Sequence, residues 1–122
     1  MRDYLSRLSR LGLSLEPRLQ TQVFTRQVQK LLSEDEYRRL QLAIINRPDS
    51  GVIVQGSGGL RKLRWSAGGR GKRGGSRVIY YWAVNEEQIL MLLIYPKNVQ
   101  DNLTRDQLNA LRKIVEAEFH GR

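Results

Sequence analysis

The chain has 122 residues, which is enough for one domain with a modest core and too few for two. Its 21 lysines and arginines outnumber 12 acidic residues and give a formal net charge of +9, so we expect an anionic partner: nucleic acid first, an acidic protein second and a membrane surface third. The absence of cysteine excludes disulfides and thiolate metal sites and favours a reducing, cytoplasmic location, and the longest apolar run is too short to span a bilayer.

Residues 1–20 are predicted to be an extension that precedes a main domain of residues 21–122. The extension places leucines among arginines and serines, so it can be a frayed tail or a short amphipathic helix that contacts the domain or a partner. It has no continuous apolar stretch and contains Asp3 and Glu16, which argues against a secretion signal or a transit peptide.

Two helices joined by a short link are predicted next. Thr21–Phe24 is a short strand or the start of a helix, and the apolar residues that follow recur at i, i+4, i+7 and i+8, as Phe24, Val28, Leu31 and Leu32. Ser33 and Glu36 have the spacing of a capping box, so a second helix should begin there and run to about Asn46. Its buried stripe is expected to contain Tyr37, Leu40 and Ile44. The proline-containing segment 47–51 ends this helix, and the two helices form a hairpin.

Three runs rich in aliphatic, β-branched and aromatic residues predict strands. They are "GLRKLRW" from Gly59, "SRVIYYWAV" from Ser76 and "QILMLLIY" from Gln88. The polar "NEE" between the second and third runs suits a hairpin turn. The third run is apolar on both faces, as expected for a strand with a covered back.

A helix is predicted to close the chain. Thr104 and Gln107 repeat the capping-box spacing, and the apolar residues that follow lie at helical spacing: Leu108, Leu111, Val115 and Phe119. We therefore predict an α+β fold with a small, mostly antiparallel sheet, an N-terminal helical hairpin and a C-terminal helix, the helices packing on one side of the sheet.

The segment from Ser50 to Asn85 contains no carboxylate but seven basic residues, namely Arg61, Lys62, Arg64, Arg70, Lys72, Arg73 and Arg77. A run of charge is ordinarily a solvated face. These residues, however, lie on and between apolar strands with no acid beside them, which favours a binding site for a polyanion. The middle of the segment, "GGRGKRGG", can be an RGG-like flexible loop that binds RNA or a wide hairpin whose glycines adopt positive φ, and we expect a mobile basic hairpin that combines the two. It is not a phosphate-binding P-loop, because Lys72 is followed by arginine rather than serine or threonine.

The residues available for catalysis are few. His120 is the only histidine, so a histidine acid–base pair is excluded and a Ser-His-Asp triad is disfavoured. No cluster of histidine and carboxylate suits zinc, and no acidic cluster accompanies the basic segment to hold magnesium, so we expect neither a metal nor a cofactor. Chemistry on RNA would then use lysine, arginine and tyrosine. Crowded positive charge lowers the pKa of a lysine, so that it can accept a proton, and arginines stabilise a pentavalent phosphorus. The nucleophile is the 2′-hydroxyl of the RNA. Because DNA has no 2′-hydroxyl, it cannot be cut by this route.

The order of these motifs resembles the RelE-like toxins of bacterial type II toxin–antitoxin pairs, and within them the HigB-type branch. The resemblance is carried by "GSGGLRKLRW", "GRGKRGGSRVIYYW", "LLIYPKNVQDNLT" and the closing helix, and it covers roughly Val23 to Phe119. It implies an mRNA endoribonuclease that acts in the ribosomal A site. It also implies a tightly bound antitoxin, which we expect to be a helix-turn-helix protein whose complex with the toxin binds operator DNA.

The resemblance also implies roles for single residues. Lys62 and Arg64 match the family's lysine/arginine positions, with Lys62 as general base, and Arg77 matches the arginine that stabilises the phosphorane. Lys97 lies near the late basic position, often arginine in the family, and would protonate the leaving 5′-oxygen, while Tyr95 would stack on a base or assist it. The closing helix has no tyrosine to match the one that RelE-type enzymes use. Contacts to RNA or the ribosome are assigned to Arg61, Arg70, Lys72 and Arg73.

Two other functions remain open from the sequence: a ParE-like toxin that binds DNA gyrase, which shares the fold, and an RNA-binding module without catalysis. Arg77 can instead be a structural ion-pair partner, and Tyr95 can be a core residue. The nuclease hypothesis requires the cationic groups to converge in one concavity without being neutralised by acids inside the protein.

Overall fold

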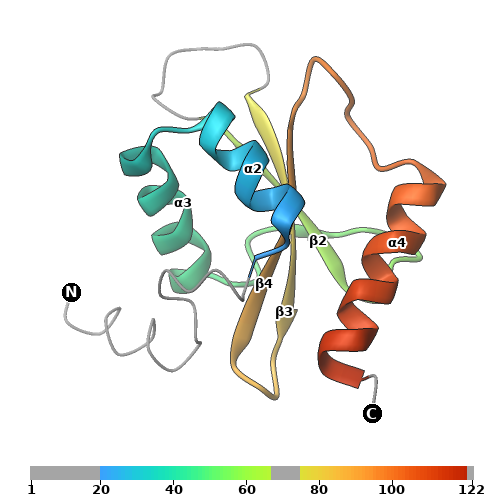
Figure 1. Cartoon of the computed structure of the whole chain (residues 1–122). Helices are drawn as coiled ribbons and strands as arrows, with labels where there is room; N and C mark the ends of the chain where they lie inside the picture. The colour runs from blue at the N-terminus through green and yellow to red at the C-terminus, as the bar shows by residue number, and fades with distance from the viewer. Residues whose placement is uncertain (1–19, 67–74, 121–122) are drawn as a thin grey trace.

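The centre of the molecule is a four-stranded antiparallel sheet, seen nearly edge-on in Figure 1. The computed structural model describes residues 20–66 and 75–120. Within these ranges the strands follow one another in chain order across the sheet, as β1 (Val52–Ile53), β2 (Leu60–Trp65), β3 (Ser76–Ala83) and β4 (Gln88–Pro96). The three predicted strands are present, and the short edge strand β1 was not predicted, because two exposed residues leave no alternation to detect.

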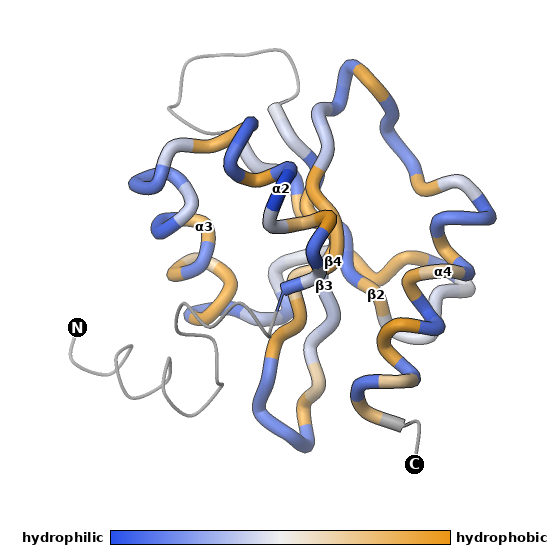
Figure 2. Tube along the Cα trace, viewed as in Figure 1, coloured by the Kyte–Doolittle hydropathy of each residue, from blue (hydrophilic) through white to orange (hydrophobic). Residues whose placement is uncertain are grey.

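The predicted helical hairpin covers one face of the sheet. It consists of α2 (Gln22–Leu31) and α3 (Glu34–Asn46), and α3 begins with the expected capping box, in which Ser33 and Glu36 each accept a backbone N–H of the other. Phe24, Leu40 and Ile44 are fully buried against Val78 of β3 and other residues of this face. Figure 2 shows that the apolar sides of both helices face the sheet.

The C-terminal helix lies on the opposite face, which corrects the prediction that all helices share one side. Helix α4 (Arg105–Val115) starts after the N-cap Thr104, as predicted, and continues into a π-helical turn, η3 (Glu116–His120). Leu111 and Val115 of α4 bury Ile79 of β3 in a second apolar cluster (Figure 1). The central strands are apolar on both faces, so each face needs a cover.

The strand register aligns the polar residues on the face that α4 covers. Arg64 lies opposite Arg77 in the β2–β3 ladder, and Arg77 lies opposite Tyr95 in the β3–β4 ladder. Lys62 is two residues before Arg64 and therefore points to the same face. The apolar cluster under α4 occupies one half of this face, and these polar residues occupy the other.

Gly75 fixes the start of β3. Its φ of +54° belongs to the left-handed region, and a Cβ at this position would lie 2.3 Å from the carbonyl oxygen of Trp65, so only glycine fits. The carbonyl of Gly75 accepts the backbone N–H of Lys97, which extends the β3–β4 pairing beyond the end of β4. The predicted basic hairpin at residues 67–74 and the extension up to residue 19 lie outside the described residues. No helix in the described ranges is long and apolar enough to cross a membrane.

Candidate functional site

The site is the polar half of the sheet face under α4, which we call the basic face and define by Lys62, Arg64, Arg77 and Tyr95. Three adjacent strands supply these residues, and the ladders hold Arg64, Arg77 and Tyr95 in one row across the sheet. Side chains directly opposite each other in an antiparallel pair lie about 4.5–5.5 Å apart at Cβ. The structure thus brings four of the predicted catalytic residues onto one surface.

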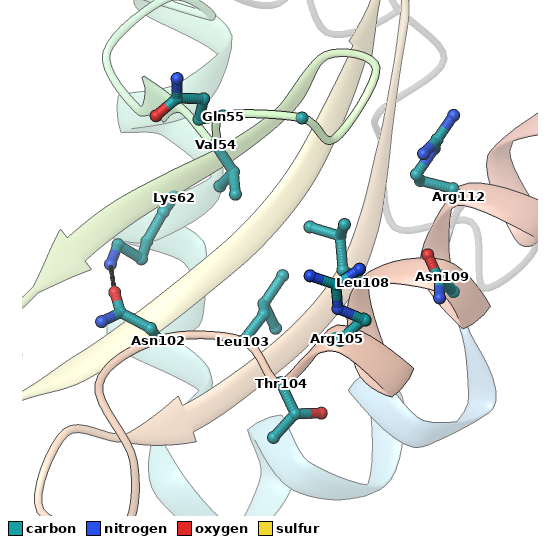
Figure 3. A pocket seen from close by; sticks show the side chains of 11 residues that line it. Val54, Gln55, Lys62, Asn102, Leu103, Thr104, Arg105, Leu108, Asn109 and Arg112 are labelled. Atoms are coloured by element: carbon teal, nitrogen blue, oxygen red, sulfur yellow. Dashed lines mark hydrogen bonds between the residues drawn. The ribbon is translucent and has the colours of Figure 1, made fainter.

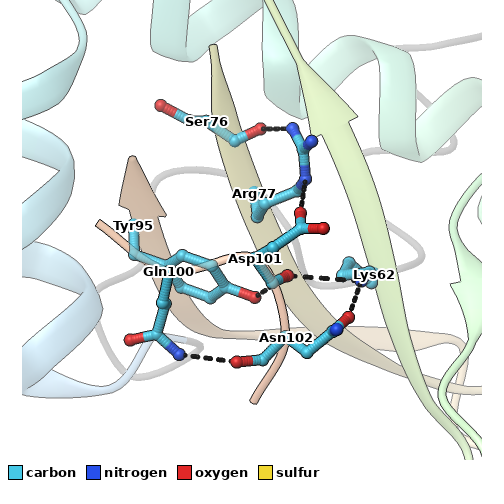
Figure 4. Close-up of polar contacts among 7 residues, drawn as sticks. All are labelled: Lys62, Ser76, Arg77, Tyr95, Gln100, Asp101 and Asn102. Atoms are coloured by element: carbon cyan, nitrogen blue, oxygen red, sulfur yellow. Dashed lines mark hydrogen bonds and ion pairs between the residues drawn. The ribbon is translucent and has the colours of Figure 1, made fainter. Parts of the chain in front are cut away.

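The segment between β4 and α4 crosses the basic face and contacts it through Asp101 and Asn102 (Figure 4). The Asp101 carboxylate accepts the Nε–H of Arg77 at 3.1 Å, and the Asp101 carbonyl accepts from Tyr95 Oη at 3.2 Å and from Lys62 Nζ at 3.3 Å. Lys62 Nζ also donates to Asn102 Oδ1 at 2.7 Å. One short segment therefore joins residues from all three strands.

Arg77 has a structural partner as well as a candidate catalytic role. Its side chain is 4% exposed, whereas that of Asp101 is 55% exposed, and Arg77 also donates to the carbonyl of Ser76 at 3.4 Å. This ion pair places an acid of the protein against Arg77, so at this one residue the requirement of the nuclease hypothesis is not met. A phosphate that reaches Arg77 must share it with Asp101 or displace Asp101, and because the carboxylate is half exposed, it can move into water without a large desolvation change.

Tyr95 is buried, and its ring belongs to the apolar cluster beneath α4. The pKa of its phenol is raised, first by burial and then by the charge of Asp101, while Arg77 acts in the opposite direction. The phenol therefore keeps its proton at neutral pH and donates to Asp101. A buried ring cannot stack on a base, so in this conformation Tyr95 anchors the segment that carries Asp101.

Lys62 and Arg64 are the accessible cations of the basic face. Lys62 is half-buried, and its hydrogen-bond partners among residues 20–66 and 75–120 are two neutral acceptors, Asp101 O and Asn102 Oδ1. Arg64 is exposed and has no hydrogen-bond or ion-pair partner within the described part of the chain. With Arg77, three cations face one carboxylate, so the surface keeps an excess of positive charge that suits a phosphate group.

Other predicted residues do not join the basic face. Lys97 is exposed just beyond the end of β4, and its backbone N–H donates to Gly75 O. Arg61 points to the opposite side of β2, where it donates to the carbonyls of Asp49 and Gly51 and lies 5.8 Å from the ring centre of Trp82. It therefore holds the loop before β1. Arg70, Lys72 and Arg73 lie outside the described residues.

Asp101 and Asn102 were not predicted as site residues. The sequence feature that could have pointed to them is the polar stretch "QDN" between an apolar strand and a capped helix. It belongs to "LLIYPKNVQDNLT", one of the segments that carry the family resemblance. Within residues 20–66 and 75–120, no three residues from histidine, cysteine, aspartate and glutamate come together in a way that could hold a metal ion.

Comparison with known protein families gives one match that spans most of the chain. The family model described as the RelE toxin of the RelE/RelB toxin–antitoxin system matches residues 19–120. The observed helical hairpin, antiparallel sheet and C-terminal helix agree with that fold, and the family implies a cognate antitoxin as partner. The chain belongs to the RelE toxin family and is the toxin of a toxin–antitoxin pair.

Proposed function

We propose that this toxin is an endoribonuclease of the HigB type that cuts mRNA on the ribosome and so stops translation. The observation that supports the proposal best is the position of three basic residues on one face of the sheet: Lys62 and Arg64 lie on β2, and Arg77 lies on the adjacent strand β3, opposite Arg64. Toxins of the matched family are usually ribonucleases that inhibit translation, which favours this chemistry over gyrase binding.

In the proposed reaction, Lys62 accepts the proton of the 2′-hydroxyl next to the cleaved phosphate. The O2′–P bond forms and the P–O5′ bond breaks, while Arg64 and Arg77 stabilise the added negative charge on the phosphoryl oxygens. Lys97 lies outside the basic face, beyond the end of β4, and we propose that it reaches the departing 5′-oxygen of the bound RNA and gives it a proton. The products are a 2′,3′-cyclic phosphate and a 5′-hydroxyl, and the side chains of the protein supply the acid, the base and the charge.

Asp101 occupies the position from which a phosphate would reach Arg77. We propose that the scissile phosphate replaces the Asp101 carboxylate at Arg77, an exchange of one anion for another at a buried guanidinium. The contact of Tyr95 with the Asp101 carbonyl remains during this exchange, because it involves the backbone and not the carboxylate.

We propose the ribosome, mRNA, an antitoxin and operator DNA as partners, as the family resemblance implies. The ribosome positions the mRNA, so purified RNA alone is cut poorly, and the toxin works in the cytoplasm. The antitoxin is a helix-turn-helix protein that neutralises the toxin, and their complex binds operator DNA. We also propose that residues 1–20 are an extension that precedes the toxin domain of residues 21–122, with Gln20, at its end, pairing with Met91 of β4.

The test is expression of the parent chain beside Lys62→Ala, Arg77→Ala and the control Lys30→Ala, whose lysine is exposed on α2 on the other face of the sheet. The parent and the control should arrest growth and leave cut mRNA in translating cells, as mapped by primer extension. Lys62→Ala and Arg77→Ala should relieve both effects, and a thermal melt of each variant separates lost catalysis from lost folding.

Arrest with intact transcripts and blocked DNA supercoiling would instead identify a gyrase inhibitor. Arrest and cleavage that persist in Lys62→Ala would show that Lys62 is not the base, and the proposed mechanism would be wrong.

A further inference from the structure

A pocket of about 590 Å³ lies beside Lys62, between the segment that follows β1 and the N-terminal half of α4 (Figure 3). This volume is within the range of about 300–1,000 Å³ that is usual for small-ligand sites. Figure 3 shows Lys62 at one end of the pocket and Arg112 towards the other. The pocket therefore continues the basic face along the surface, past Lys62 and away from Arg77.

Both walls of the pocket are held by local hydrogen bonds. The segment after β1 is closed by Ser57, whose buried hydroxyl donates to Val54 O and accepts the N–H of Leu60 at 2.9 Å, while Val54 N–H donates to Leu60 O at 2.8 Å. The opposite wall is the first turn of α4, which the Thr104–Gln107 capping box fixes. Hydrogen bonds within the protein therefore hold both walls of the pocket in place.

The pocket is positively charged. Lys62, Arg105 and Arg112 line it, and none of the residues that line it is acidic. The guanidinium groups of Arg105 and Arg112 are exposed and have no hydrogen-bond or ion-pair partner in the described ranges. A Cβ added at Gly58 would lie 3.8 Å from Arg112 Nε, so this arginine reaches across towards the loop before β2. Cations placed at separate points along a groove suit a backbone of successive phosphates.

Apolar and amide side chains lie between the cations. Val54, Leu103 and Leu108 provide an apolar surface for the flat face of a base, as Figure 3 shows. Gln55 and Asn109 add amide groups, each with donors and an acceptor that can pair with a base edge. The combination of charge, apolar surface and amides matches a nucleotide better than an acidic peptide, whose carboxylates would leave the apolar surface uncovered.

We propose that this pocket holds the nucleotide on the 5′ side of the cleaved bond in single-stranded RNA. The inference rests on the proposed function. Lys97 and Val54 lie on opposite sides of the row formed by Arg64, Arg77 and Tyr95. The N–H of Lys97 donates to Gly75 O, just before the start of β3, and the N–H of Val54 donates to Leu60 O, at the start of β2. If Lys62 takes the 2′-hydroxyl proton and Lys97 protonates the 5′-oxygen, the strand runs with its 5′ side towards Val54 and the pocket. Arg105 and Arg112 then bind the phosphate preceding that nucleotide.

The binding test uses the full-length chain and a 2′-O-methyl RNA trinucleotide, which lacks the attacking hydroxyl and cannot be cleaved. Backbone NMR signals of residues 103–109 and 54–56 should shift on titration. Arg112→Ala should weaken binding by about five- to tenfold, in the range of one or two charged contacts. Lys113→Ala is the matched control, because Lys113 is the next residue in the same last turn of α4 and does not line the pocket.

Equal effects of Arg112→Ala and Lys113→Ala would overturn the proposal, since they would show a general attraction to charge. Shifts of the same signals by tetraglutamate at equal affinity would also overturn it and would indicate a groove for an acidic peptide. Trinucleotide binding at this pocket without any mRNA cleavage in cells would refute the nuclease and keep the nucleotide site. Cleavage that Arg112→Ala and Lys113→Ala leave equally intact would refute the site and keep the nuclease.

Discussion

Asp101 determines both the charge and the arrangement of the basic face, because it pairs with Arg77 and its carbonyl accepts from two neighbours. In Asp101→Asn, the amide oxygen can still accept from Arg77, but the negative charge beside Arg77 and Lys62 is removed. We expect trinucleotide binding to tighten by up to about fivefold, the effect of about 1 kcal/mol between partly exposed charges. Fluorescence anisotropy with labelled 2′-O-methyl RNA measures this change.

Asp35→Asn is the control for that variant. Asp35 is an exposed acid on α3 that pairs with Arg38 and Arg39 on the other face of the sheet, so its removal changes the net charge by the same amount. Equal tightening in both variants would show that net charge alone is responsible. Weaker binding in Asp101→Asn would show that Asp101 positions Arg77 and does not compete with phosphate.

The raised pKa of Tyr95 predicts a pH-dependent contribution to stability. The unfolded phenol ionises near pH 10 and the folded one at higher pH, so the stabilisation is complete below pH 10 and is lost as the pH rises through the folded pKa. Tyr95→Phe loses the hydrogen bond to Asp101 and should be about 0.5–1.5 kcal/mol less stable at pH 7. Urea unfolding should show this deficit shrinking above pH 10; a deficit that stays constant to pH 11 would contradict the prediction.

At the scale of elements, two capping boxes permit a matched comparison. Thr104 caps α4 beside the pocket, and Ser33 caps α3 on the other face. Thr104→Ala and Ser33→Ala should each lower the free energy of unfolding by about 1 kcal/mol. Only Thr104→Ala should also weaken binding of the trinucleotide, because the first turn of α4 carries Arg105 and Leu108 into the pocket wall.

Thermal unfolding and NMR titration of the two capping variants provide both measurements. The same loss of RNA binding in both variants would mean that reduced stability, and not the pocket, is the cause. An unchanged affinity in Thr104→Ala would remove the first turn of α4 from the binding surface.

For the whole molecule, the net charge of +9 predicts RNA binding that depends strongly on salt. If the toxin neutralises three to five phosphates of a single-stranded RNA, the logarithm of the binding constant should fall with the logarithm of the salt concentration, with a slope of about −2 to −3.5. Arg112→Ala should make this slope shallower by about 0.7 for each phosphate that the variant no longer binds. Binding that hardly changes between low and physiological salt would contradict a site that recognises phosphates.

The sequence alone determined the helices and the three longer strands of this protein, but not the short edge strand β1. Helix starts at Ser33 and Thr104 and the three longer strands were predictable because caps and hydrophobic periodicity are local properties of the chain. The family resemblance led us to expect Lys62, Arg64, Arg77 and Lys97 together. The ladder register places the first three on one face, whereas Lys97 lies beyond the end of β4.

Only the tertiary structure decided which helix and which loop cover the face of the sheet that carries Lys62, Arg64 and Arg77. Periodicity shows which side of α4 is apolar, but the face of the sheet that α4 covers depends on how the whole chain packs. The prediction that all helices pack on the same face of the sheet was therefore wrong. The contact of Asp101 with Arg77 and the separation of Arg61 from the site follow from that packing. A loop without periodicity acquires its position from the elements it connects, so the pocket formed by α4 and the segment after β1 was not visible in the sequence.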